Sequence, residues 1–137
     1  MPIEDDAVIR KILTEAKVIA LVGASKKPYR DSYRIGQFLL SKGYTVIPVN
    51  PNYTEIEGEK CFPHLQAIGR PIDIVDIFRA SDAVGEIVED AAAVHAKAVW
   101  MQSGVVNEKA AQKAESAGIA VIMDRCIAVE FTRLMKA

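Results

Sequence analysis

The stretch from Val18 to Ser32, VIALVGASKKPYRDS, constrains this chain more than any other part of its sequence. Five apolar residues lead directly into Gly23, which is followed by a small, basic loop and then by an amphipathic segment over residues 31–42. An unbroken apolar run is typical of a strand that is buried on both faces, as in a parallel sheet. A glycine at its end lets the backbone approach a ligand closely, and the next helix directs free N–H groups toward that ligand. The stretch therefore predicts a phosphate-binding turn between the first strand and the helix that follows it.

Apolar runs alternate with segments of helical periodicity along the rest of the chain. We expect five strands, over residues 18–22, 44–49, 72–78, 98–102 and 119–123. We expect a leading helix with Val8, Ile9, Ile12 and Leu13 on one face. Four further helices are expected to begin near Asp31, after Ser81 and Asn107 as N-caps, and near Cys126. Residues 52–69 show no regular period, which predicts short elements at most. Strands that alternate with helices predict an α/β fold, a doubly wound five-stranded parallel sheet in a single three-layer domain over residues 1–137.

Composition and charge exclude several classes of protein. The chain has 137 residues and a formal net charge of −1, which provides no general basic surface for nucleic acid. No apolar run approaches the roughly 18 residues of a membrane helix, and the acidic first segment does not resemble a signal peptide. Two cysteines, Cys61 and Cys126, are too few for a disulfide framework, so we expect a cytoplasmic protein. His64 and His95 lack the spacing of metal ligands, and no metal site is predicted.

The carboxyl ends of the strands are where ligands of such sheets bind. The loop after the first strand lacks the G-x-G-x-x-G pattern of dinucleotide-binding domains. Asn50 and Pro51, at the end of the second strand, stand where such domains have an acidic residue that binds the ribose. The phosphate loop of ATP-hydrolysing proteins is absent as well. The sequence therefore disfavours NAD and ATP hydrolysis.

Positive charge gathers around the same ends of the strands. Lys26, Lys27, Arg30 and Arg34 follow the first strand, and Arg79 follows the third. A nucleotide with a ribose phosphate in addition to its pyrophosphate would use such a surplus of cations. NADP and coenzyme A both fit this description, so the residues alone predict a phosphate-rich adenine nucleotide.

Several motifs in matching order cover nearly the whole chain. They are VGAS-x-x-P-x-R-x-S (residues 22–32), GY-x-VIPVNP (43–51), G-x-x-C-F-P-x-L (58–65), DIVDIFR (73–79), VWMQSGV (99–105) and MDRC (123–126). Together they resemble the small stand-alone CoA-binding protein family, relatives of the CoA-binding domain of the succinyl-CoA synthetase alpha subunit. The resemblance implies a Rossmann-like domain with coenzyme A as its cofactor.

The resemblance also implies positions for the parts of the cofactor. The pyrophosphate would lie on the turn and the adenosine at the ends of the second and third strands. The implied binding residues are Gly23, Ala24, Ser25, Lys27, Pro28, Arg30, Asn50, Pro51, Phe78 and Arg79. The synthetases carry their phosphorylated histidine in a second domain, so no ligase chemistry is implied for these residues. Phe131 stands where relatives are expected to have a histidine.

Two functional hypotheses follow. The first is a non-catalytic protein that carries, senses or buffers CoA or an acyl-CoA, because the predicted phosphate site has no accompanying acid, base or metal cluster. The alternative is an NADP- or acyl-CoA-dependent enzyme or subunit, with catalytic residues from a partner chain or from Cys126. The sequence leaves open whether the chain forms a homo-oligomer, which acyl group it would take and in which pathway it acts.

Two residues carry separate hypotheses. Cys126 is predicted at a helix start beside Arg125, and both features favour a reactive thiolate that could form a mixed disulfide with CoA. The alternative, which the sequence favours, is a cysteine packed under the sheet. Asp76 lies inside an apolar strand, where we expect its carboxylate to accept a hydrogen bond from neighbouring loop backbone.

Overall fold

A parallel sheet forms the centre of the computed structural model, which describes residues 1–135. The strands of this sheet are β1 (Val18–Val22), β2 (Thr45–Val49), β5 (Ile74–Ile77), β6 (Ala98–Met101) and β7 (Ala120–Ile122). Their spatial order is β2-β1-β5-β6-β7, and every neighbouring pair is parallel. This confirms the predicted doubly wound sheet, with strand bounds within two residues of those expected.

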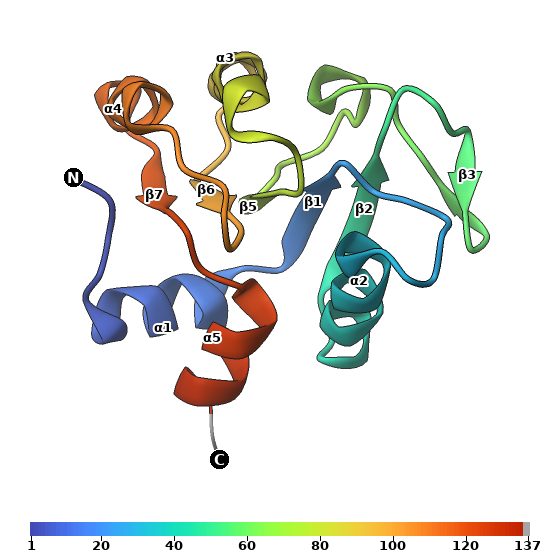
Figure 1. The fold of residues 1–137 in the computed structure, drawn as a ribbon, viewed down its shortest axis with the longest axis horizontal. Helices are drawn as coiled ribbons and strands as arrows, with labels where there is room; N and C mark the ends of the chain where they lie inside the picture. Colours follow the sequence, from blue (N-terminus) through green and yellow to red (C-terminus); the bar gives the residue numbers. More distant parts are fainter. Residues whose placement is uncertain (136–137) are drawn as a thin grey trace.

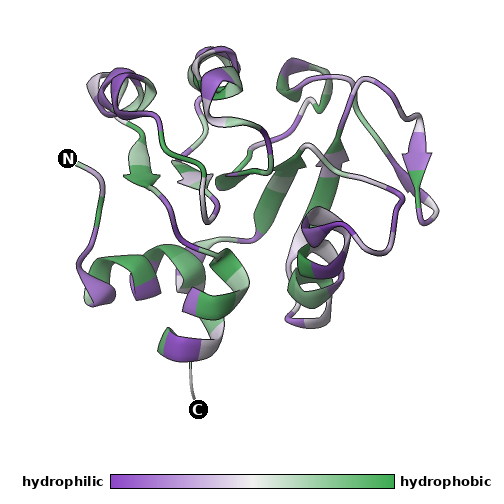
Figure 2. Ribbon diagram, viewed as in Figure 1, coloured by the Kyte–Doolittle hydropathy of each residue, from purple (hydrophilic) through white to green (hydrophobic). Residues whose placement is uncertain are grey.

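Helices cover both faces of the sheet (Figure 1). One layer consists of α1 (Asp6–Glu15), α2 (Asp31–Ser41) and α5 (Ile127–Leu134), and the other of α3 (Val84–Ala93) and α4 (Glu108–Ser116). Successive residues of a strand point to opposite faces, so each helix layer packs on its own hydrophobic cluster. Figure 2 shows the corresponding hydropathy pattern, with hydrophobic strands between helices whose outer surfaces are more hydrophilic.

The order of the strands fixes the place of a ligand site. The chain leaves β1 for β2 on one side and then returns past β1 to β5 on the other. The loops after β1 and β5 therefore diverge toward opposite faces, which opens a crevice at the carboxyl edge of the sheet. This topology predicts the principal ligand site between those two loops.

The segment between β2 and β5 contains only short elements, as expected. The hairpin strands β3 (Glu55–Ile56) and β4 (Glu59–Lys60) lie beyond the β2 edge, and a 3₁₀ turn follows at Leu65–Ala67. Figure 1 shows this hairpin projecting at the end of the molecule next to β2.

The predicted helix caps have different outcomes. Asn107 caps α4 as expected, because its Oδ1 accepts the Ala110 N–H at 2.9 Å. The prediction for Ser81 is wrong. A 3₁₀ turn occupies Ser81–Ala83, α3 begins only at Val84, and no side chain caps it. The Ser81 hydroxyl instead accepts the N–H of Val106 at 2.9 Å, so a tertiary contact with the loop after β6 replaces the local cap.

Asp76 also differs from expectation. Its side chain is fully buried in β5, and neither carboxylate oxygen has a hydrogen-bond partner within residues 1–135. The expected bond to loop backbone is absent there because Asp76 pairs in register with Leu21 and Trp100, in the middle of the sheet. Burial raises the pKa of this carboxyl well above its ordinary value.

No helix within the described part of the chain is both long and apolar enough to cross a bilayer.

Candidate functional site

A cavity of about 900 Å³ lies at the carboxyl edge of the sheet, where the strand order places a ligand site. The loops after β1, β2, β5 and β6 form its wall, together with the starts of α2 and α5. Eight of the residues predicted from the sequence line it: Gly23, Ala24, Ser25, Lys27, Arg30, Asn50, Phe78 and Arg79. Pro28 and Pro51 belong to the same loops but do not line the cavity.

Gly23 shapes the first of these loops. Its φ of +90° is unfavourable for any other residue, and a Cβ atom built there would lie 2.4 Å from the carbonyl oxygen of Phe78. The N–H groups of Gly23 and Ala24 both point to the Val49 carbonyl oxygen, at 3.0 and 3.4 Å. Close packing of the loop against Phe78 is therefore a sufficient reason for the glycine, and the N–H groups of Gly23 and Ala24 are already bonded within the protein.

Three cations in the cavity have no acidic partner. Lys27, Arg30 and Arg79 line it, and none of them forms an ion pair with a carboxylate in residues 1–135. Like charges gathered in one hollow repel one another unless an anion lies between them. The cluster therefore has the charge and the donors that a polyphosphate needs.

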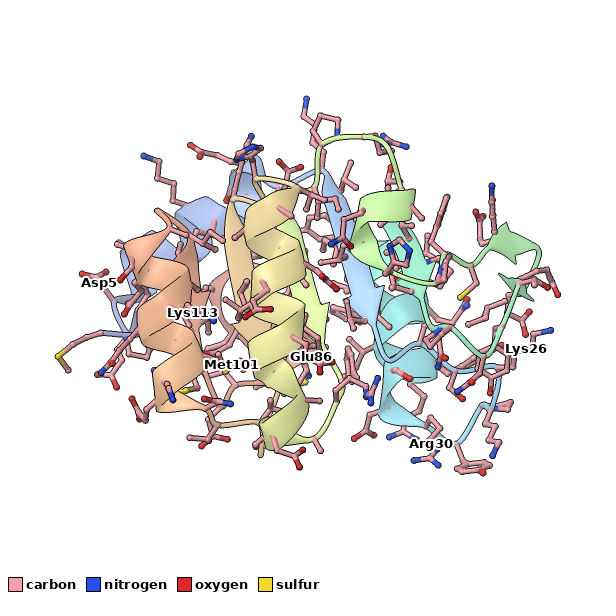
Figure 3. All side chains as sticks on the ribbon, turned by 90° about the horizontal axis from the view of Figure 1, so that it is seen from above. Asp5, Lys26, Arg30, Glu86, Met101 and Lys113 are labelled. Atoms are coloured by element: carbon pink, nitrogen blue, oxygen red, sulfur yellow. The ribbon has the colours of Figure 1, made fainter. Side chains whose placement is uncertain are left out.

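The other two predicted cations are already paired. Lys26 lies 3.2 Å from a carboxylate oxygen of Glu55 on β3 and does not line the cavity. The guanidinium of Arg34 contacts the carboxylate of Asp31 one turn earlier in α2. Figure 3 shows Lys26 beside the hairpin and Arg30 on another part of the loop, so neighbouring cations have different surroundings.

The start of α2 adds donors to the same cavity. Arg30 occupies its N-cap position, and no side chain there accepts a hydrogen bond from the first turn. The N–H groups at a helix start carry a partial positive charge and attract anions when no side chain caps them. The helix start and the three unpaired cations thus form one electropositive site.

Asn50 has a structural role at the edge of the cavity. Its Nδ2 donates to the Ala24 carbonyl oxygen at 2.8 Å, and its Oδ1 accepts the Asn52 N–H at 2.8 Å. The side chain therefore ties the loop after β2 to the loop after β1. Contact of Asn50 with a ligand stays a prediction.

The cavity also includes residues outside the predicted binding set. Tyr29, Tyr53, Gln102, Ser103, Val105 and Cys126 line it. The position of Gln102 and Ser103 directly after a strand was the signal available in the sequence, whereas Tyr53 belongs to a loop without periodicity. Trp100 is buried and donates its indole N–H to the Arg125 carbonyl oxygen at 2.8 Å, which gives it a structural role.

The loop that carries Cys126 is held in place by polar contacts. Asp124 accepts the Gly104 N–H at 2.7 Å and so joins the loops after β6 and β7. Arg125, expected to act on the thiol, instead pairs with the buried carboxylate of Glu130 at 2.5 Å. Its positive charge is therefore largely compensated by Glu130.

Acid–base groups are sparse around the cavity. Among the described residues that line it, Asp31 is the only carboxylate, and Arg34 holds it. Asp76 is buried within the sheet and does not line the cavity. Residues 1–135 contain no group of three His, Cys, Asp or Glu side chains that could hold a metal ion.

These features define a class of protein. A doubly wound parallel sheet, a glycine turn after β1 and a cation-lined cavity at the carboxyl edge are typical of Rossmann-like domains that bind phosphate-containing ligands. Residues 17–132 match the family model for the CoA binding domain, and the chain belongs to this family.

Comparisons with individual proteins agree with this assignment. The uncharacterized protein YneT of Bacillus subtilis is 42% identical over 123 residues, which cover 90% of this chain and 91% of YneT. A hypothetical protein from Pyrococcus horikoshii has a solved structure that matches with a TM-score of 0.95 and 43% identity, over 99% of this chain and 97% of that one. The chain is also homologous to part of a larger enzyme, the dinucleotide-forming acetyl-coenzyme A synthetase 1 of Ca. Korarchaeum cryptofilum. That match has 32% identity and a TM-score of 0.72, and covers 81% of this chain and 26% of the synthetase.

Proposed function

We propose that this protein binds coenzyme A or an acyl-CoA in the cavity at the carboxyl edge of the sheet and acts as a non-catalytic carrier, sensor or regulator. The observation that supports this most strongly is a set of three cations, Lys27, Arg30 and Arg79, that line one cavity and form no ion pair within residues 1–135. CoA carries a pyrophosphate and a ribose phosphate, and the donor set suits both.

The lining residues would bind different parts of CoA according to their chemistry. Lys27, Arg30 and the uncapped start of α2 would hold phosphate oxygens, and Arg79 would reach them from the end of β5. Phe78, half-buried beside Arg79, offers an apolar edge to the adenine. The cavity volume of about 900 Å³ is in the range of sites that enclose large cofactors.

The side chains that line the cavity favour a non-catalytic role. General acid–base catalysis needs a titratable pair within hydrogen-bond reach of the substrate. The lining carboxylate of Asp31 is held by Arg34, so the described residues offer no such pair. The enzyme alternative, with groups from a partner chain or from Cys126, stays a prediction.

Calorimetric titration with CoA, dephospho-CoA and NADP tests the proposal. We expect CoA to bind, dephospho-CoA to bind at least about tenfold more weakly because one charged phosphate contact is lost, and NADP to bind more weakly than CoA. Equal affinities for CoA and dephospho-CoA would mean that the proposed site does not bind the ribose phosphate. Binding of NADP alone, or of neither cofactor, would contradict the proposed function.

A further inference from the structure

The part of the cavity next to α5 contains a thiol. Cys126 lies directly before this helix, is partly exposed and lines the cavity. It is a free cysteine, and its side chain makes no capping hydrogen bond to the first turn of α5. The structure within residues 1–135 therefore leaves this sulfur without a fixed structural role.

Gln102 lies in the same part of the cavity and provides an independent sign of a ligand there. Its side chain is 5% exposed, lines the cavity and accepts the Ile127 N–H through Oε1 at 3.1 Å. This contact fixes the amide orientation, because only the oxygen can accept. The Nε2 group has no hydrogen-bond partner in residues 1–135. It is not fully buried, because the two oxygens of Asp76 are the only fully buried side-chain polar atoms without a partner in these residues. The nitrogen is therefore open to the cavity.

An amide donor held in this way suits an amide carbonyl of a ligand. A side-chain N–H group that faces a cavity and has no protein acceptor can donate to a ligand that presents an acceptor at that point. The pantetheine arm of CoA has amide carbonyls and ends in a thiol. A donor beside a cysteine thus matches the chemistry of that arm and of its reactive end.

We propose that Cys126 exchanges disulfides with oxidised CoA in this cavity and forms a protein–CoA mixed disulfide. This inference rests on the proposed function, which places CoA in the same cavity. It adds a covalent modification site, with the disulfide of CoA as the class of reactant.

The reaction balances without a further oxidant. Cys126 loses its proton to water, and the thiolate attacks one sulfur of the CoA disulfide. A new bond forms between Sγ of Cys126 and that sulfur as the original S–S bond breaks. The second CoA leaves as a thiolate with the electron pair and takes a proton from solvent. The cysteine is oxidised, and the released CoA is the reduced product.

The second cysteine provides an internal comparison. Cys61 is 4% exposed, does not line the cavity and donates its S–H toward the Asn50 carbonyl oxygen at 3.5 Å. Burial raises the pKa of this thiol, which further disfavours its thiolate. Modification guided by the cavity should therefore occur at Cys126 and not at Cys61.

Intact-protein mass spectrometry tests the proposal. Reduced protein is incubated with CoA disulfide or, separately, with oxidised glutathione at equal concentration, and peptide mapping locates the adduct. We expect one CoA adduct at Cys126 that dithiothreitol removes, formed at least about tenfold faster than the glutathione adduct because the cavity holds the reactant. Excess reduced CoA should slow the reaction, Cys126→Ser should abolish it, and Arg79→Gln should lose most of the preference for CoA.

Reduced CoA is titrated calorimetrically into the same preparation, which separates the two proposals. If reduced CoA binds but the CoA disulfide reacts no faster than oxidised glutathione, or reacts at Cys61, the inference about Cys126 is wrong and the proposed function stands. If reduced CoA does not bind, both are wrong.

Discussion

Asp76 makes the stability of this protein depend on pH in an unusual direction. The carboxyl is fully buried on β5, the strand between β1 and β6, and its oxygens have no hydrogen-bond partner in residues 1–135. Burial penalises the charged form and raises the pKa of Asp76 well above the ordinary value of 3.8. The folded protein therefore keeps a proton that the unfolded chain has already released.

The sign and size of the effect follow from this difference in bound protons. Below the unfolded pKa of 3.8 both states hold the proton, and Asp76 imposes no penalty for ionisation. As the pH rises above that value, the free energy of unfolding falls by about 1.4 kcal/mol per pH unit until the pH passes the folded pKa. The penalty then stays constant.

Asp76→Asn removes this proton and leaves a side chain of nearly the same shape. Urea unfolding of both proteins between about pH 4.5 and pH 8 can be followed by the fluorescence of the buried single tryptophan, Trp100. Within this range and below the folded pKa of Asp76, we expect the free energy of unfolding of the wild type to fall relative to that of Asp76→Asn by about 1.4 kcal/mol for each pH unit. A stability difference that does not change with pH would show that the carboxyl is not held protonated, and would refute the reasoning.

Three further predictions concern local structure. Gly43→Ala should cost about 1–2 kcal/mol of unfolding free energy, because φ is +95° there but no atom lies within 4 Å of the new Cβ. Gly23→Ala should cost about 1–3 kcal/mol more, because its Cβ would lie 2.4 Å from the Phe78 carbonyl oxygen. Equal losses for the two variants would contradict this contact. Asp73→Asn should lower stability at pH 7 by about 1–3 kcal/mol in urea unfolding. The Asp73 pKa is lowered although burial opposes this, because two N–H groups at 2.8 and 2.9 Å at the start of β1 stabilise the carboxylate. The loss of stability in Asp73→Asn should therefore shrink as the pH falls through the folded pKa of Asp73. A loss that grew instead would be inconsistent with those bonds. Asn107→Ala should cost about 1 kcal/mol in the same assay, and no loss would mean that the cap of α4 contributes nothing.

Much of the fold could be predicted because local patterns and burial agree. The apolar run of β1 is buried at every position, and Asn107 caps α4 where the sequence placed that boundary. Ser81 shows the limit of local patterns. Its hydroxyl binds Val106, which lies 25 residues further along the chain, so a tertiary contact decided a feature that looked local.

The site could be predicted in outline but not in its pairing of charges. The sequence placed five cations near one edge of the sheet, and only the structure separates those already neutralised from those available to a ligand. Lys26 faces Glu55 because the irregular hairpin folds back toward the loop after β1, which no periodicity indicates. The contact between Gln102 and Ile127 likewise depends on how α5 packs, and it could not be inferred from residue spacing.

The CoA affinity of two neighbouring lysine variants tests the central claim most directly. Lys27→Gln removes an unpaired cation of the cavity, whereas Lys26→Gln removes a cation of the same loop that lies outside the cavity and is paired with Glu55. Calorimetry at near-physiological salt should show CoA binding weakened by about 10–100-fold for Lys27→Gln, as expected for one charged phosphate contact, and changed by less than about twofold for Lys26→Gln. Equal effects of the two substitutions, or a larger effect at Lys26, would contradict a CoA site built on the unpaired cations.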